Sequence, residues 1–270
     1  MTNPIALNTI TIKQVGDLRE KIEIAAEAEY DGVGLWAGDL AAFLEGGGEL
    51  AEVKDMLEEN GLSVPEVCFV GGWMGVTAAD RKQALAEAKR AFQHASEIGA
   101  YSVIACAAGH QVDIADAAKD YSLLCDVAAD FGVVPALEFL GGAATVKDVK
   151  TAAEVVARAD HELGGILLDT FHFYRGGSEP EDILAIRDAR VAMVHANDAA
   201  GAPRFEMNDL HRVYCGEGEI PLEAIFTNLR EVGYRQAFSV EIFNEEYWAS
   251  DPMRVAQKAR VAIDEVLARL

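Results

Sequence analysis

The chain has 270 residues, of which 51% are hydrophobic and 25% are charged, a composition typical of a folded protein rather than a disordered one. Its formal net charge is −22, and a field of that sign repels polyanions, which argues against nucleic acid as a partner. The sequence also lacks a run of the ~20 apolar residues that a membrane span needs. Its first residues do not have the pattern of a secretion signal. We therefore expect a cytoplasmic protein without a membrane partner.

Eight apolar, β-rich runs alternate with helical patterns along the chain. This alternation predicts a parallel sheet covered by helices, in an α/β fold with a single (β/α)8 TIM barrel over residues 1–270 as one domain. The expected strands are Ile5–Thr11, Gly32–Trp36, Val64–Val70, Ser102–Ala107, Val134–Phe139, Gly165–Asp169, Ala192–Ala196 and Phe238–Phe243.

Helical segments between these strands have recognisable faces and start signals. Apolar residues recur at three- and four-residue steps from Ala84 to Ile98, as expected for a helix packed on a barrel. A capping-box pattern begins at Thr77, and Asp251 followed by proline predicts the start of the last helix. The segment Asp198–Ile220 is a long loop, which a compact barrel keeps mainly for function.

Four cysteines are spread over the chain without a C-x-x-C pair. This spacing argues against a thiolate metal site and against a disulfide framework, and it predicts buried or idle thiols. The four are Cys68, Cys106, Cys125 and Cys215.

Polar residues interrupt four successive apolar strands near their carboxyl ends. Glu138, Asp169, His195 and Glu241 each stand where a core residue is expected, and the carboxyl ends of barrel strands carry the active sites of this architecture. A single such residue can be a helix cap or an ion-pair partner. Four on adjacent strands favour a bound cation, since few other partners compensate so much buried charge. Three carboxylates and one imidazole suit Mn²⁺, Co²⁺, Zn²⁺ or Mg²⁺.

The sequence resembles the xylose-isomerase-like barrel superfamily over nearly its whole length. Within that superfamily it is most similar to the inosose (keto-inositol) isomerases and the ketohexose 3-epimerases. Four segments carry the resemblance: Leu168–Gly177, Val194–Asp198, Asp209–Leu222 and Ser239–Trp248.

The resemblance implies roles for individual residues. Glu138, Asp169, His195 and Glu241 would bind one divalent metal ion, and His172 and Arg212 would contact the substrate. Cys215 departs from the pattern, because relatives usually have proline before the glycine there, and the shape of that loop is therefore open.

The implied chemistry is proton movement at a carbon beside a carbonyl, through a metal-stabilised enediolate. We hypothesise that Glu138 and Glu241 flank the substrate as catalytic acid and base. Return of the proton to the same carbon would give an epimerase, and its return to the neighbouring carbon an isomerase. The loop after the last strand has no glycine or lysine for a phosphate, which favours an unphosphorylated carbohydrate or polyol ketone.

Several alternatives stay open. A dehydratase (lyase) acting on a keto-inositol or dehydroshikimate could use the same enediolate. An apurinic-site endonuclease-like protein shares the fold but would want a basic groove. A noncatalytic sugar-binding barrel has no evident need for the four-residue set. The resemblance also suggests a homo-oligomer.

Overall fold

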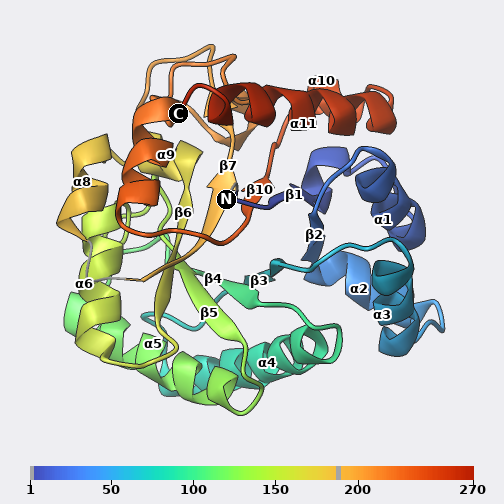
Figure 1. The fold of residues 1–270 in the computed structure, drawn as a ribbon. Coiled ribbons are helices and arrows are strands. Elements are labelled where there is room, and N and C mark those ends of the chain that lie inside the picture. Colours follow the sequence, from blue (N-terminus) through green and yellow to red (C-terminus); the bar gives the residue numbers. More distant parts are fainter. Residues whose placement is uncertain (1–2, 187–189) are drawn as a thin grey trace.

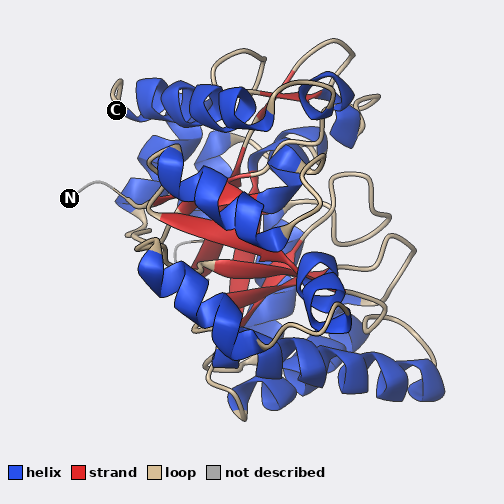
Figure 2. Ribbon diagram, turned by 90° about the vertical axis from the view of Figure 1, so that its right-hand side faces the viewer, coloured by secondary structure: helices blue, strands red, loops and turns tan. Residues whose placement is uncertain are grey.

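The computed structural model describes residues 3–186 and 190–270 and confirms the α/β barrel. Parallel strands close in the order β1-β10-β7-β6-β5-β4-β3-β2, with helices wrapped around them (Figures 1 and 2). The barrel strands are β1 (Ile5–Asn8), β2 (Gly32–Trp36), β3 (Glu66–Val70), β4 (Ser102–Cys106), β5 (Val134–Glu138), β6 (Gly165–Asp169), β7 (Val191–Ala196) and β10 (Phe238–Val240).

The helices bury one face against the strands and begin at the caps that the sequence predicts. Thr77 accepts a hydrogen bond from the Asp80 N–H at the start of α4, and Asp251 caps α11 with proline at its first position. The helices are α1 (Leu18–Glu27), α2 (Ala37–Glu45), α3 (Leu50–Glu59), α4 (Ala78–Glu97), α5 (Ile114–Ala129), α6 (Val149–Ala159), α7 (Thr170–Arg175), α8 (Pro180–Ala185), α9 (Leu222–Glu231), α10 (Glu245–Trp248) and α11 (Pro252–Leu267).

The first and the last strand are each three residues shorter than the sequence predicts. The first ends at Asn8, because the Asn8 side chain accepts a hydrogen bond from the Ile10 N–H and starts a 3₁₀ turn at Thr9–Ile12. The last ends at Val240, although the Glu241 N–H still reaches the Ala196 carbonyl at 3.3 Å. Glu241 therefore lies just beyond its strand rather than within it.

The barrel interior follows the two-residue period of its strands. A small hydrophobic cluster takes alternate positions, such as Ala136 on β5, Leu167 on β6 and Met193 on β7. Two residues further along, the same faces carry Glu138, Asp169 and His195. The predicted site residues thus continue the inward-facing rows toward the carboxyl end of the barrel.

The long loop between β7 and α9 is more ordered than its composition suggests. It contains a two-stranded antiparallel ribbon, β8 (Asp198–Ala199) with β9 (Arg212–Val213), and a 3₁₀ turn at Asp209–His211. The Asp198 carboxylate accepts hydrogen bonds from the N–H groups of Gly216, Gly218 and Ile220. This arrangement holds Arg212 over the barrel mouth. Among the described residues, no helix is long and apolar enough to cross a membrane.

Candidate functional site

Strand register brings the four predicted ligand residues together at one end of the barrel. Asp169 pairs with His195 across β6 and β7, while Glu138 and Glu241 lie on either side of that pair in the strand order. All four are buried, and each offers one ligand atom within 4.8 Å of the others. The structure thus assembles the cluster that the sequence predicts, and the role of these residues as metal ligands is a proposal.

The His195 ring lies at the centre of this cluster. Its Nδ1 atom is 3.1 Å from Glu241 Oε2, 3.7 Å from Asp169 Oδ2 and 3.9 Å from Glu138 Oε1. Among the described residues, this buried nitrogen has no hydrogen-bond partner of acceptable geometry. Buried polar atoms normally have a partner, and a divalent cation would provide one for this nitrogen. One imidazole nitrogen and three carboxylates form a donor set that suits such a cation, so the residues fit a metal ion.

Arg212 supplies positive charge beside the same carboxylates. Its Nη1 donates to Asp169 Oδ2 at 2.6 Å and to Glu241 Oε2 at 2.9 Å, and its Nη2 donates to Asp209 Oδ1 at 2.8 Å. The guanidinium is buried and both Nη atoms donate to carboxylates, whereas its Nε atom has no hydrogen-bond partner among the described residues. Arg212, which the sequence predicts to contact the substrate, holds the carboxylates of Asp169 and Glu241 in this structure.

Burial and neighbouring charges separate the pKa values of the site residues. Burial raises the pKa of Glu138 to about 8, against the opposing charge of His195. Burial would also raise the pKa of Asp169, but the charges of Arg212 and the two histidines lower it to about 2. Burial lowers the pKa of His172 to about 4, which leaves this ring neutral at pH 7. For His195 the effect of burial is outweighed by Glu241 and Glu66, which raise its pKa, so a cation must displace a proton there.

A cavity of about 360 Å³ opens onto the cluster. Its ionisable lining residues are Glu138, His172, His195, Asp209, Arg212 and Glu241. Its other walls are apolar or carry thiols, from Trp36, Cys68, Phe69, Ile104, Cys106, Leu140 and Phe243. The volume is at the small end for ligand pockets and suits a compact molecule.

The sequence-based reasoning missed three residues that contact the cluster from β1, β3 and β4. Cys106 donates to Glu138 Oε2 at 3.2 Å, so this thiol is not idle. Asn8 Nδ2 lies 3.4 Å from Glu241 Oε1. Glu66 contacts the Nε2 atom of His195, and its carboxylate also accepts a hydrogen bond from Ser239 Oγ. The sequence does show Glu66 as the single acidic residue of the apolar segment that forms β3. It was missed because only the carboxyl ends of the strands were searched for polar residues.

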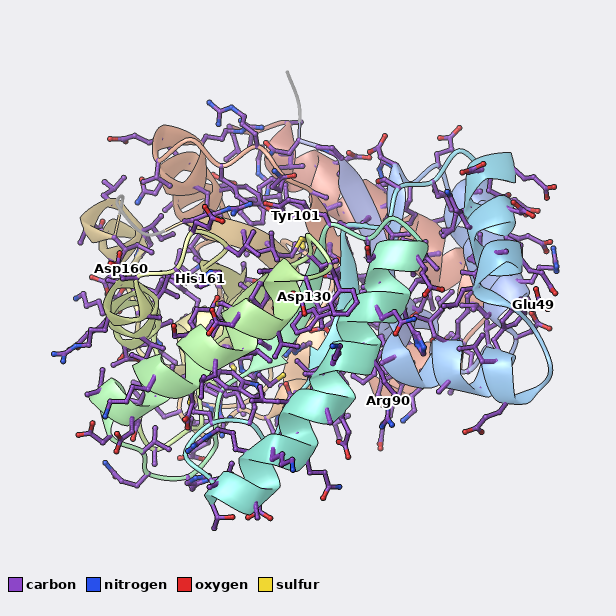
Figure 3. The ribbon with its side chains drawn as sticks, turned by 90° about the horizontal axis from the view of Figure 1, so that it is seen from below. Glu49, Arg90, Tyr101, Asp130, Asp160 and His161 are labelled. Carbon is purple, nitrogen blue, oxygen red and sulfur yellow. The ribbon has the colours of Figure 1, made fainter. Side chains whose placement is uncertain are left out.

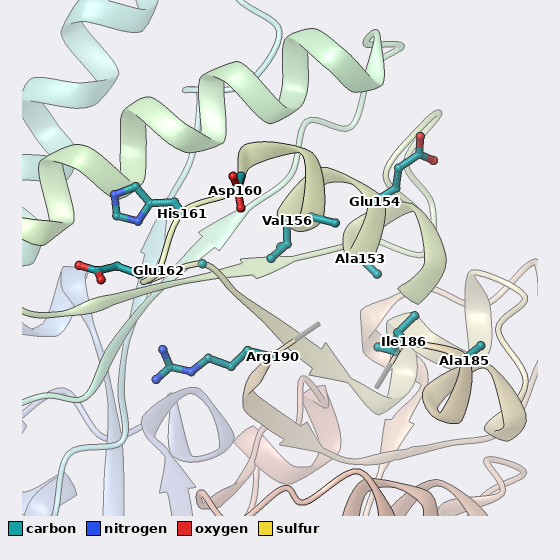
Figure 4. Close-up of a pocket in the computed structure, with 11 residues that line it drawn as sticks. Ala153, Glu154, Val156, Asp160, His161, Glu162, Ala185, Ile186 and Arg190 are labelled. Carbon is teal, nitrogen blue, oxygen red and sulfur yellow. The ribbon is translucent and has the colours of Figure 1, made fainter. Parts of the chain in front are cut away.

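A larger cavity, of about 710 Å³, lies at the opposite end of the barrel. It is lined by the end of α6, the segment leading into β6, and α8 with Arg190 (Figure 4). Figure 3 labels residues of the connections that lead into β4, β5 and β6 at this end, namely Tyr101, Asp130, Asp160 and His161. Active sites of such barrels lie at the carboxyl ends of the strands, so the smaller cavity is the functional candidate.

Comparison with known proteins identifies a related family and several relatives. The family model described as a xylose isomerase-like TIM barrel matches residues 22–264. The inosose isomerase of Bacillus subtilis is 33% identical over 144 residues, which are 52% of this chain and 52% of that protein. The 3-dehydroshikimate dehydratase of Pseudomonas putida is 28% identical over 251 residues, which are 89% of this chain and 38% of that protein. The matches therefore span about half or less of these curated relatives.

Solved structures show the same fold. The IolI protein with a bound zinc atom superimposes with a TM-score of 0.92 at 23% identity, over 98% of each chain. An L-ribulose 3-epimerase superimposes with a TM-score of 0.79 at 18% identity, over 99% of this chain and 95% of that one. At these identities the likeness concerns the fold alone.

Proposed function

Because this chain belongs to the xylose isomerase-like TIM barrel family, we propose that it is a divalent-metal-dependent isomerase or epimerase of a compact polyol ketone, similar to an inosose isomerase. The observation that carries the proposal is the unpartnered Nδ1 of His195 among the carboxylates of Glu138, Asp169 and Glu241. The name of one relative, an inosose isomerase, supports the reaction class.

Four residues would hold the cation: Glu138, Asp169, His195 and Glu241. A bound divalent ion would supply Lewis acidity toward a carbonyl oxygen and its neighbouring hydroxyl, which weakens the adjacent C–H bond. The chemistry of the donor set, three oxygens and one nitrogen, is compatible with Mn²⁺, Co²⁺, Zn²⁺ or Mg²⁺.

Glu138 and Glu241 are the proposed acid and base. They reach the cavity from strands that are separated by β6 and β7, so they approach a substrate from different sides. Their surroundings differ, because Glu241 accepts from Arg212 whereas Glu138 accepts from the weakly polar thiol of Cys106. Burial raises the pKa of Glu138 to about 8, which makes its carboxylate a stronger base than an ordinary glutamate and suits the group that takes the proton from carbon.

The walls of the cavity favour an uncharged substrate. Among the described residues that line it, Arg212 is the one permanent cation, and its guanidinium already serves Asp169, Asp209 and Glu241. A phosphate or carboxylate group would meet acidic side chains with no cationic side chain free to compensate it, and the proposed metal ion would already be balanced by its three carboxylate ligands. Aromatic side chains such as Trp36 and Phe243 can instead pack on the C–H faces of a sugar or cyclitol.

A second candidate is a dehydratase, because the 3-dehydroshikimate dehydratase relative matches 89% of this chain. The same proton abstraction can end in loss of a β-hydroxyl as water. Dehydroshikimate carries a carboxylate, however, and the shortage of free cations in the cavity argues for the neutral ketone.

The test is to follow inosose, ketohexoses, hydroxypyruvate and dehydroshikimate by NMR in deuterated buffer with Mn²⁺. We expect solvent deuterium to enter a neutral ketone and an isomer or epimer to accumulate. Dehydration of dehydroshikimate without exchange into any neutral ketone would favour the lyase. Exchange into none of the substrates would reject the proposed reaction.

A further inference from the structure

Glu66 is a fully buried carboxylate that the proposed chemistry does not use. It lies at the start of β3 on an inward-facing position and has 0% of its surface exposed. On the neighbouring strand, a Cβ atom at Gly34 would stand 2.4 Å from Glu66 Oε1. The missing side chain at Gly34 therefore provides the space that the carboxylate occupies.

Three donors converge on this carboxylate. Oε1 accepts hydrogen bonds from Ser239 Oγ at 2.6 Å and from Asn8 Nδ2 at 3.0 Å. Oε2 lies 2.7 Å from His195 Nε2. Because two donors already point at Oε1, this carboxylate serves as an acceptor, and the 2.7 Å contact is that of the Nε2–H group of His195 donating to Oε2.

The contact fixes both the ring orientation and the tautomer of His195. With Nε2–H directed to Glu66, the Nδ1 atom faces Glu138, Asp169 and Glu241 and can offer its lone pair to a cation that displaces its proton. Histidine ligands commonly donate their other ring N–H to a carboxylate, which orients the ring and makes it a better ligand. Glu66 therefore contacts one nitrogen of the imidazole, while Glu138, Asp169 and Glu241 lie around the other.

We propose that Glu66 is a positioning residue that holds His195 in the orientation and tautomer required for metal binding, with Gly34 and Ser239 holding Glu66 in turn. The inference rests on the metal site of the proposed function. It assigns a task to a residue of the barrel half that supplies none of the four proposed ligands.

An alternative is a second cation, because Glu66, Cys68 and His195 also bring ligand atoms within 4.8 Å of one another. Two observations favour hydrogen bonding instead. Glu66 Oε1 already accepts from two donors, and the distance of 2.7 Å from Oε2 to Nε2 is that of a direct hydrogen bond. Metal stoichiometry distinguishes the two readings.

The experiment measures binding of Mn²⁺ to the whole chain by calorimetry, and the absorption spectrum of the Co²⁺-loaded protein. Glu66→Gln leaves one acceptor oxygen for three donors, so we expect Mn²⁺ affinity to fall roughly 10- to 100-fold and the Co²⁺ spectrum to change. Gly34→Ala, which pushes the carboxylate away, should act in the same direction. Ser239→Ala should have a smaller effect.

The matched control is Asp120→Asn. Asp120 is also a buried carboxylate, but it accepts from the Gly75 N–H and pairs with Arg81, away from the cluster. Its variant should lower the melting temperature without changing the Mn²⁺ affinity. A merely structural Glu66 would behave in the same way as Asp120.

The outcomes separate the two levels of the proposal. If wild type binds one Mn²⁺ and Glu66→Gln and Gly34→Ala bind it equally well, the positioning role is rejected. Two cations per chain, one of them lost in Glu66→Gln, would replace it with a second metal site. If wild type binds no divalent cation, the proposed function fails together with this inference.

Discussion

The two halves of the barrel wall contribute different chemistry to one cavity. Strands β5, β6 and β7 and the residue after β10 provide four ionisable side chains around a point. Strands β1 to β4 provide the neutral side chains of Trp36, Cys68 and Cys106, which line the cavity, and of Asn8, which contacts Glu241. They also provide one carboxylate, Glu66, whose Oε2 lies 2.7 Å from His195 Nε2. One half can therefore bind a cation and move protons, and the other shapes the wall and orients those groups.

The largest effect is expected in the ionisable half. Glu138→Gln and Glu241→Gln keep the size of the side chain but remove its basicity, and we expect the rate of solvent deuterium exchange into substrate to fall roughly 10²- to 10⁴-fold. Cys125→Ser, remote from the cavity, is the control for handling and folding. Exchange at the wild-type rate in either glutamine variant would remove that residue from the acid–base pair.

A much smaller effect is expected in the neutral half. Cys106→Ala removes one weak hydrogen bond to Glu138, worth about 0.5–1.5 kcal/mol, which corresponds to roughly a two- to tenfold change in kcat/KM. Steady-state kinetics on the ketone substrate measures it. A loss as large as that of Glu138→Gln would show that the division between the halves is wrong.

The third effect concerns the stability of the metal-free protein rather than its activity. Burial raises the pKa of Glu138 from its ordinary value near 4.5 to about 8, so the folded state holds this proton more tightly than the unfolded state. The resulting stabilisation is complete below about pH 4.5 and is lost as the pH rises through about 8. In excess chelator, the melting temperature of wild type should therefore decline relative to Glu138→Gln across that range. Parallel melting curves for the two proteins would contradict the shift.

The sequence was sufficient to predict the barrel and the four converging residues, because strand alternation determines which side chains face inward and at which end. It was not sufficient for Glu66, Asn8 and Ser239. Glu66 and Ser239 do not lie at the carboxyl ends of their strands, and Asn8 lies inside the longer first strand that the sequence predicts. Their importance depends on the register between β1, β2, β3 and β10 and on the empty space at Gly34. The last strand was predicted too long, because the apolar pattern continues to Phe243 whereas β10 ends at Val240. Beyond that end, the Glu241 N–H still donates a hydrogen bond to the Ala196 carbonyl.

The metal dependence of proton exchange tests the central claim most directly. The metal content of the purified chain is measured, the metal is removed with a chelator, and deuterium exchange into the ketone is followed by NMR before and after Mn²⁺ is returned. The account predicts that exchange is lost with the metal and recovers when the ion is restored. Exchange that persists at the same rate after complete metal removal would contradict it.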